Sequence, residues 1–402
     1  MRTDAEPKPD DGAIGATIRI SKLTLFVSFL KLGATAFGGP AMVAYMRELT
    51  VKKKSWLSEA SFRDGVALCQ TIPGATVMQM AAYVGWRAGG VASAILAYAA
   101  FALPAFALML IFAMLYRHGE NMQVVMAMFR GLQVIVIALM ANATITFGKS
   151  LLRNWPDWLL TAGAAVALGF GINPLLVIGA AALLGLGCYW KQDLLSSESA
   201  VPAPKVAWQP LAAAGFLILA TALSLIALFQ CDRKLFDLSV VMLKVDAAAF
   251  GGGYASLPLM LNEVVEVRHW VDDKVVLDGI ALGQITPGPI VITATFVGYQ
   301  VAGLAGAVLS TFAIFTPSLI LVLASAPCLD RLQRSRLFRA ALRGPLASFT
   351  GLLLAATVRL GLNAPWTVTT VIIAGLAFAA LRLQINILWV VLVGATASFL
   401  LL

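Results

Sequence analysis

Apolar runs of 17 to 27 residues recur along this chain from Leu23 to Leu402, and they limit its fold more than any other feature. An α-helix needs roughly 20 apolar residues to cross the hydrocarbon core of a bilayer. Only 12% of the 402 residues are charged, against about a quarter in soluble domains, and 60% are hydrophobic. Strand-like alternation is absent, so a transmembrane barrel is excluded. The sequence predicts an all-α, polytopic transmembrane helical bundle.

The formal net charge of +9 does not indicate a nucleic-acid partner. Most Lys and Arg residues lie in short loops between apolar runs, where they hold those loops in the cytoplasm. Residues 1–22 carry both signs of charge and lack the apolar core of a signal peptide, so a polar N-terminal arm is expected.

Chemistry-bearing motifs are missing from the chain. Its four cysteines are far apart, it has two histidines, and it contains no CxxC, GxxxxGK[ST], GxSxG or HExxH pattern. No metal site, no cofactor and no enzymatic activity are therefore predicted, and a pump driven by its own ATPase is not expected.

The chain contains an internal duplication. "KLGATAFGGPAMVAYM" at 31–46 aligns with "KVDAAAFGGGYASLPL" at 244–259, so the lysine, the phenylalanine and the glycines share one register. After a one-residue insertion, "WLSEASFRDGVALCQTIPGA" from Trp56 aligns with "WVDDKVVLDGIALGQITPGP" from Trp270. Such agreement among glycines, prolines and charges indicates a repeat of about 170 residues. The predicted division is an arm (1–22), an N-terminal transporter repeat (23–189), a linker with an extra transmembrane helix (190–230) and a C-terminal repeat (231–402).

Loop charges indicate that the two repeats are inverted. The segment 47–64 carries five basic and three acidic residues, whereas its counterpart 263–278 carries two basic and five acidic ones. The bias is reversed in the next loop, because 330–343 holds five arginines and 117–130 is only mildly basic. Positive loops prefer the cytoplasm, so equivalent loops are expected to face opposite sides of the membrane.

A topology with nine crossings fits this pattern. In each half, two hairpins at the Gly-Gly and Pro-Gly breaks would enter and return, and four crossing helices would follow, near 90–116, 131–148, 157–171 and 173–189 in the first half. The extra apolar run Leu211–Phe229 makes the count odd and turns the second half over. The segment 64–86 is equally compatible with one broken crossing helix.

The breaks suit an anion site. Glycines and prolines inside an apolar segment free backbone groups, which are tolerated only in protein or beside a water-filled cavity. A helix that begins after a break directs positively polarised N–H groups into that cavity, and glycine permits close approach of a ligand. Four helix ends are expected to converge near the middle of the membrane.

Lysines and neutral polar residues surround these breaks. Lys31 and Lys244 lie about two turns before them, where a cation needs a partner, the interface or an anion. Lys31 snorkelling to the interface and Lys244 pairing with Asp246 stay open as alternatives, and the amides and hydroxyls near the second break serve equally as contacts between helices. The candidate substrate-binding residues are Lys31, Gly38, Gly39, Pro40, Gln70, Thr71, Pro73, Gly74, Lys244, Gly251, Gly252, Gly253, Gln284, Thr286, Pro287, Gly288 and Pro289.

Other charged residues occupy matching positions in the repeats. Asp64 and Asp278 begin apolar segments, where each can cap a helix, the favoured interpretation, or carry a coupling proton. Arg130 and Arg343 stand at segment boundaries and are interpreted as interfacial anchors.

The FGGP and FGGG segments, the PGA and PGP segments, and the two linked repeats resemble the long-chain members of the chromate ion transporter family from about Phe26 to the C-terminus. The pattern is carried by Lys31, Phe37, Gly38, Gly39, Pro40, Pro73, Gly74, Phe250, Gly251, Gly252, Pro287, Gly288 and Pro289. Gly253 and Ala75 depart from it because each replaces a proline, so an asymmetric site is expected.

The resemblance implies a multi-pass protein of the bacterial inner membrane that exports chromate and confers resistance, with sulfate as a competing analogue. Alternating access around the midplane site is the expected mechanism. A carrier or exchanger of sulfate or another oxyanion stays open, because dipoles and ammonium groups discriminate poorly between similar dianions. An anion channel and, more remotely, a membrane-embedded chromate reductase are further alternatives, and a homodimer is left open.

Overall fold

The computed structural model describes residues 20–37, 40–119, 123–189, 208–328, 335–364 and 366–401. Every regular element in these residues is a helix. The first half comprises α1 (Lys22–Thr35), α2 (Pro40–Arg47), the π-helix η1 (Glu48–Lys53), α3 (Glu59–Thr71), α4 (Thr76–Gly119), α5 (Gln123–Leu151), α6 (Trp155–Gly169) and α7 (Pro174–Tyr189).

The second half follows the first element by element, after α8 (Trp208–Cys231). It comprises α9 (Arg233–Ala247), η3 (Gly253–Ala255), α10 (Ser256–Leu261), η4 (Asn262–Val267), α11 (Asp273–Ile285), η5 (Ile290–Ile292), α12 (Thr293–Ser325), η6 (Ala326–Cys328), α14 (Arg336–Asn363), α15 (Val368–Arg382) and α16 (Ile387–Leu401). Even the π-helix recurs, since η4 repeats η1. The expected all-α fold of two homologous halves is confirmed.

The predicted breaks are real interruptions of helices. α3 ends at Thr71 and α4 begins at Thr76, on either side of the Pro-Gly pair, and α11 and η5 flank the equivalent pair. α4 and α12 each contain a further break, because the backbone leaves helical geometry at Gly89–Gly90 and at Ala302–Gly303. Each half therefore contains discontinuous helices, as the sequence predicts, and also a long helix that extends beyond the expected crossing segment.

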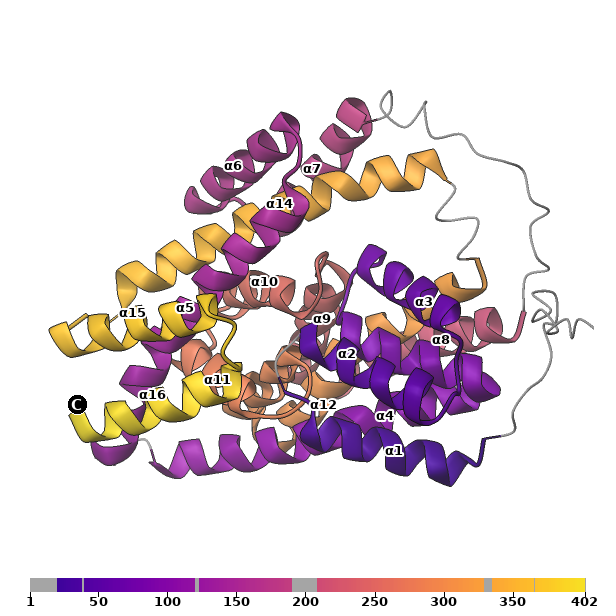
Figure 1. The fold of residues 1–402 in the computed structure, drawn as a ribbon, viewed down its shortest axis with the longest axis horizontal. Coiled ribbons are helices and arrows are strands. Elements are labelled where there is room, and N and C mark those ends of the chain that lie inside the picture. Colours follow the sequence, from indigo (N-terminus) through magenta and orange to yellow (C-terminus); the bar gives the residue numbers. More distant parts are fainter. Residues whose placement is uncertain are drawn as a thin grey trace, which may run out of the picture.

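Packing between the halves is reciprocal. α14 of the second half lies against α6 and α7, and α5 of the first half lies against α15 and α16 (Figure 1). Equivalent glycines mediate both contacts: a Cβ at Gly344 would collide with the carbonyl of Ala181 on α7, and one at Gly131 would collide with Ser398 on α16. Each half thus completes its packing with a helix pair from the other half.

Five helices in the described residues are long and apolar enough to cross a bilayer. They are Thr76–Arg117, Met128–Leu151, Trp208–Cys231, Ile290–Cys328 and Leu337–Asn363. α7, α15 and α16 are apolar but shorter. The 15 residues of α6 span about 22 Å, less than the roughly 30 Å of a hydrocarbon core. The count of nine crossings depends on these short helices and stays a prediction.

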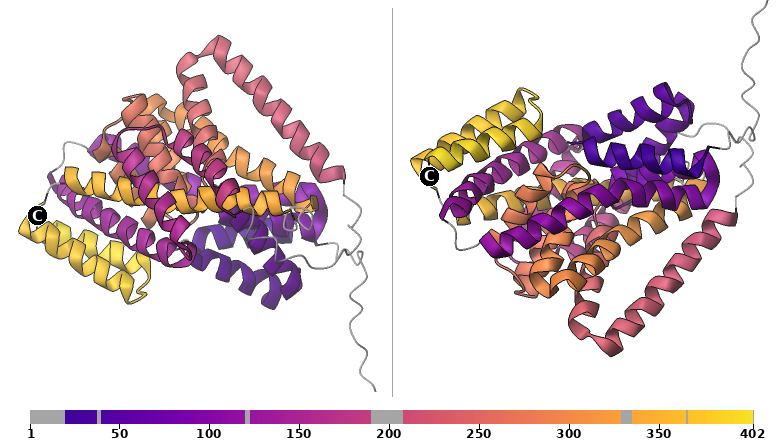
Figure 2. Two further views of the ribbon diagram at one scale, coloured as in Figure 1. Left: turned by 90° about the horizontal axis from the view of Figure 1, so that it is seen from above. Right: turned by 90° about the horizontal axis from the view of Figure 1, so that it is seen from below.

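α8 lies along the outside of the bundle. Figure 2 shows it running away from most other helices before the chain turns into α9. It contacts mainly α12 and α9, and only 6% of its apolar window is buried. An apolar helix with so little protein contact suits lipid on most of its surface.

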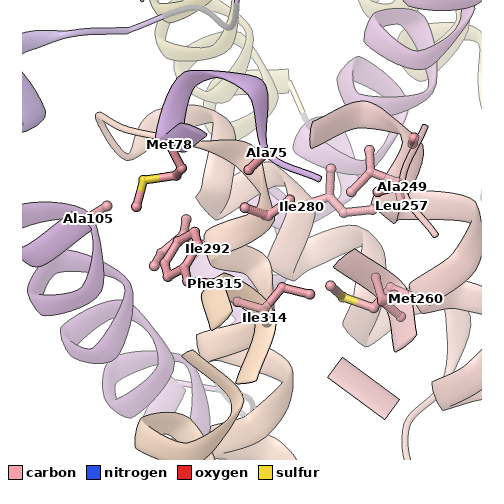
Figure 3. Packing of buried hydrophobic residues seen from close by; sticks show 14 of the residues in the cluster. Ala75, Met78, Ala105, Ala249, Leu257, Met260, Ile280, Ile292, Ile314 and Phe315 are labelled. Atoms are coloured by element: carbon pink, nitrogen blue, oxygen red, sulfur yellow. The ribbon is translucent and has the colours of Figure 1, made fainter. Parts of the chain in front are cut away.

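The core lies where the discontinuous segments meet. Figure 3 shows Ala75, directly before α4, and Met78 of α4 near Ile292 of η5 and Phe315 of α12. All four side chains are buried. The two halves therefore share one hydrophobic core, which fixes the helix ends described next.

Candidate functional site

Left-handed glycines form the breaks. φ is +111° at Gly74 and +106° at the equivalent Gly288, and Gly251 and Gly252 have φ of +100° and +91°. Residues with a Cβ rarely adopt this region, so these positions favour glycine. The sequence signal for a chain break is thus also a requirement of the backbone.

Two equivalent hydrogen bonds cross between the halves at these glycines. The Gly74 N–H donates to the Ala249 carbonyl (3.0 Å), and the Gly288 N–H donates to the Ala36 carbonyl (3.0 Å). Ala36 and Ala249 precede the two Phe-Gly-Gly segments at matching positions of the repeat. Each Pro-Gly break is therefore docked on the Phe-Gly-Gly segment of the opposite half, so the repeats interlock at their breaks.

A cavity of about 980 Å³, here called the interhalf cavity, lies beside these breaks. Its wall includes the starts of three helices: Thr76 of α4, Gly253 of η3 and Ile290 of η5. The predicted site residues that line it are Gln70, Thr71, Gly251, Gly252, Gly253 and Pro289. The structure thus brings polar groups of the first half together with the glycine segment of the second half.

Close packing leaves little room at the glycine segment. A Cβ on Gly252 would lie 3.0 Å from the Thr76 hydroxyl, and one on Gly253 would lie 2.9 Å from Cγ2 of Ile290. The bare backbone at 252 and 253 therefore forms part of the cavity wall.

Four arginines line the interhalf cavity: Arg47, Arg153, Arg339 and Arg343. Arg47 forms an ion pair with Glu59 (2.8 Å), and this hydrogen bond holds the pKa of the Glu59 carboxyl below its usual value. The Arg343 guanidinium lies over the Tyr189 ring, 5.1 Å from its centroid. Guanidinium groups bind tetrahedral oxyanions with paired N–H donors, so the wall has the chemistry of an anion site.

Sequence reasoning missed these arginines as site residues. The sequence pattern predicts an interfacial anchor at Arg343, and the arginine-rich segment before it indicates only the orientation of the chain. The available signal was spacing, because Arg339 and Arg343 are four residues apart and share one face of α14. Arg47 and Arg153 gave no such signal, since only the tertiary fold brings them to this wall.

The predicted lysines lie elsewhere. Lys31 lines a separate cavity of about 730 Å³ along α1, together with Lys53 and Lys54. The Lys244 ammonium lies 3.9 Å from a Glu263 carboxylate oxygen. The alternative partner Asp246 is instead fully buried. A role of the two lysines in binding stays a prediction.

The other predicted residues form the supports of the breaks. Gln284 lies 3.5 Å from the hydroxyl of Tyr254, which lines the interhalf cavity. The Thr286 hydroxyl donates to the Leu282 carbonyl of its own helix (2.7 Å). Pro40 begins α2, whereas Gly38 and Gly39 lie outside the described residues. Pro73, Gly74, Pro287 and Gly288 make the two Pro-Gly breaks themselves.

The capping interpretation of the paired aspartates is wrong. Asp64 and Asp278 lie inside α3 and α11, whose caps are Ser58 and Asp272. Asp64 is exposed, whereas Asp278 is buried and accepts hydrogen bonds from Tyr116 (2.8 Å) and Gln133 (2.7 Å). The helices begin one to two turns earlier than the apolar pattern suggests, because polar residues extend them toward the surface.

Comparisons with known proteins agree with this architecture. The family described as "Chromate transporter" matches the chain twice, over residues 23–186 and 236–399. An uncharacterized transporter of Methanocaldococcus jannaschii is 43% identical over 95% of each chain. Chromate transport proteins of Pseudomonas aeruginosa and Cupriavidus metallidurans are 31% and 28% identical over 94% and 93% of this chain, and 91% and 92% of their own. No solved structure matches the chain.

Proposed function

Because this chain belongs to the chromate transporter family, we propose that it exports chromate from the cytoplasm and thereby confers chromate resistance. The observation that carries the proposal is the interhalf cavity, where arginines meet the starts of discontinuous helices from both halves. Relatives named chromate transport proteins, aligned over nearly the whole chain, support the substrate.

The cavity offers two kinds of contact to a tetrahedral dianion. Arg339 and Arg343 supply N–H donors from one helix face, and Arg153 adds a further guanidinium. The starts of α4 and η5 supply polarised backbone N–H groups. Gln70, Thr71 and the glycines complete the proposed contacts, and no metal or cofactor is required.

Alternating access is the proposed mechanism. The Gly74–Ala249 and Gly288–Ala36 hydrogen bonds join equivalent points of the repeat. In an inverted repeat, exchanging the conformations of the halves converts an inward-open state into an outward-open one. We therefore propose that these two hydrogen bonds differ between the inward-open and the outward-open state.

The membrane potential favours export without a further energy source. Outward movement of a dianion across a cell-negative membrane is assisted by about 2.3 kcal/mol per charge per 100 mV. We place the protein in the bacterial inner membrane as a multi-pass carrier, with the bilayer as its surroundings.

A carrier or exchanger of sulfate or another oxyanion is the second candidate. Guanidinium groups and helix ends recognise charge and tetrahedral shape, which chromate and sulfate share, so this wall has no element that rejects sulfate. We therefore expect sulfate to compete for the same cavity.

Radiolabelled chromate uptake into everted membrane vesicles tests the proposal. Uptake should be saturable, should fall when excess sulfate is added, and should decline when an interior-positive potential is collapsed. Vesicles without the protein are the control. Uptake equal to that control would refute chromate as the cargo, whereas single-channel currents in planar bilayers would replace the carrier with an anion channel.

A further inference from the structure

Asp246, near the end of α9, is a buried carboxyl that the proposed anion site does not use. Its Oδ2 accepts hydrogen bonds from the N–H (2.9 Å) and the hydroxyl (2.7 Å) of Ser318 on α12. The Ser318 hydroxyl in turn accepts from the N–H of Ala75 (2.9 Å), and Ala75 lines the interhalf cavity. A short chain of hydrogen bonds thus connects Asp246 to the cavity wall.

Two acceptor oxygens beside this chain lack a donor. Asp246 Oδ1 and Gln79 Oε1 are buried and accept no hydrogen bond from the described part of the protein. Gln79 uses its Nε2 to donate to the Pro73 carbonyl (2.5 Å). Buried acceptors without donors are costly, so this arrangement indicates a bound species that supplies one.

The three polar side chains meet at Gly74. A Cβ on Gly74 would lie 2.8 Å from Gln79 Nε2 and 3.1 Å from Asp246 Oδ2, and it would collide with the Ser318 hydroxyl. All three side chains are fully buried. The absence of a side chain at 74 therefore lets these three side chains form one small polar cluster, built from α4, α9 and α12.

Basic residues do not neutralise this carboxyl. Lys244, on the same helix, faces Glu263, and no ion pair to Asp246 occurs among the described residues. Tyr98 of α4 is a phenol that is neutral at physiological pH, and its hydroxyl donates to the Phe315 carbonyl (2.6 Å). α8 and α10, which also pack against α9, bring no Asp, Glu, Lys, Arg or His. An ionised Asp246 would be an unpaired charge inside a membrane protein, which is expensive.

We propose that the Asp246–Gln79–Ser318 cluster is a proton-binding site, and that one proton crosses inward through Asp246 as the anion crosses outward. The inference rests on the proposed transport function. The proton binds Oδ1 from the extracytoplasmic side, forming an O–H bond and a neutral carboxylic acid. It leaves Oδ1 to the cytoplasm in the opposite conformation. The bound proton supplies a donor where the cluster has two unused acceptors.

The position of Asp246 close to the cavity wall links its protonation to anion movement. Hydrogen bonds to an ionised carboxylate are roughly twice as strong as those between neutral groups. Deprotonated Asp246 therefore holds Ser318, and through it Ala75, more firmly than protonated Asp246 does. Because Ala75 and Thr76 lie in the wall of the interhalf cavity, the charge state of Asp246 alters how tightly the first Pro-Gly break is held.

Comparison of the two repeats shows that only the second half has a carboxyl at this position. The position equivalent to Asp246 is Gly33, where a Cβ would collide with the Phe101 carbonyl. The first half thus uses that position for close packing of α1 on α4. One proton site, rather than a symmetric pair, follows from this difference.

Reconstituted protein tests the inference, with internal pH reported by a trapped dye and the potential clamped by K⁺ and valinomycin. In the wild type, an imposed pH gradient should drive radiolabelled chromate against its gradient. Asp246→Asn preserves the shape of the side chain but binds no proton, so it should lose this drive while retaining exchange of chromate for chromate. Asp237→Asn on the same helix is the control, because Asp237 is partly exposed and pairs with Arg268 (3.3 Å), and it should keep the drive. Asp278→Asn tests a rival proton site, because Asp278 is also a buried carboxyl.

Several results would overturn the proton site at Asp246. They are pH-driven uptake by Asp246→Asn at the wild-type rate, loss of the drive in Asp278→Asn alone, and a wild type driven by Na⁺ gradients instead of pH gradients. If Asp246→Asn does not assemble, Ser318→Ala replaces it, because it removes the hydroxyl that donates to Asp246 and should shift the pH profile of transport to higher pH. An unchanged profile would contradict the inference. Chromate exchange without proton movement defeats only this inference, whereas absence of exchange in the wild type defeats the proposed function.

Discussion

The predicted anion site and the observed cavity differ in which charged residues they contain. The sequence placed positive charge at Lys31 and Lys244, whereas the structure lines the interhalf cavity with four arginines. A lysine inside an apolar run is an isolated charge, so the sequence pattern marks it as unusual. An arginine in a basic loop is one of several charges, so the pattern does not mark it. The same arginines have two roles. Their charge orients the loop in the membrane, and it also lines the cavity when the helix that carries it extends beyond the membrane surface.

Arg343→Ala should raise the KM for chromate about tenfold, because loss of one charge-assisted hydrogen bond costs roughly 1.5–3 kcal/mol. Initial rates of chromate uptake in vesicles measure this effect. Arg130→Ala is the matched control, since Arg130 is the repeat equivalent of Arg343 and does not line the cavity. Equal KM values for both variants would exclude Arg343 from the anion site.

Gly252→Ala should abolish most transport without preventing insertion into the membrane. The new Cβ must fit 3.0 Å from the Thr76 hydroxyl at φ +91°, where strain of about 1–3 kcal/mol is also expected. Gly171→Ala is the control because it has φ +75° but open space around it, so it shares the strain without the contact. Comparable transport by the two variants would show that close approach at 252 is irrelevant.

At the scale of elements, each half packs one helix against a pair of helices from the other half. α14 packs on α6 and α7, and α5 packs on α15 and α16, each through a glycine. Small residues allow close approach of helices where lipid gives no hydrophobic driving force. The sequence repeats these glycines as Gly131 and Gly344, but nothing in it indicates that their partners belong to the opposite half.

Gly344→Val should destabilise the protein by about 1–3 kcal/mol, because a side chain there meets the Ala181 backbone on α7. Thermal unfolding in detergent, followed by size-exclusion chromatography of heated samples, measures the loss. Gly375→Val on α15 is the control, since it has open space around it. A melting temperature for Gly344→Val as high as that control would contradict the observed packing of α14.

At the scale of the whole molecule, the halves interlock at the breaks and share one core. Ala75 and Ile292, from different halves, belong to the same buried cluster (Figure 3). Movement of one half therefore cannot leave the breaks of the other unchanged. This is the physical basis for expecting both halves to take part in transport, even though their sites differ in detail.

Opposite orientation of the halves predicts opposite labelling of equivalent loops. In a protein whose four free cysteines are replaced, Lys53→Cys in intact cells should react with an impermeant thiol reagent differently from Val267→Cys, its counterpart in the repeat. Everted vesicles should reverse the result, because positive loops such as the one with Lys53 face the cytoplasm. Labelling of both positions from the same side would refute the inversion.

Sequence alone determined the membrane class, the duplication and the positions of the helix breaks. These features are local: an apolar run, a repeated register and a Pro-Gly pair each act through their own stretch of chain. It also identified six residues of the cavity wall, since glycines, prolines and nearby amides lie where the breaks occur.

Tertiary structure decided which charges meet and which half supplies each wall. Arg47 and Arg153 reach the cavity through the folding of distant segments, and Asp246 meets Ser318 and Gln79 only because α9, α12 and α4 converge at Gly74. The sequence around one residue does not show which residues it contacts when those residues are far away in the chain. The duplication determined the order of helices and breaks in each half. The packing of one half on the other determined which residues line the site.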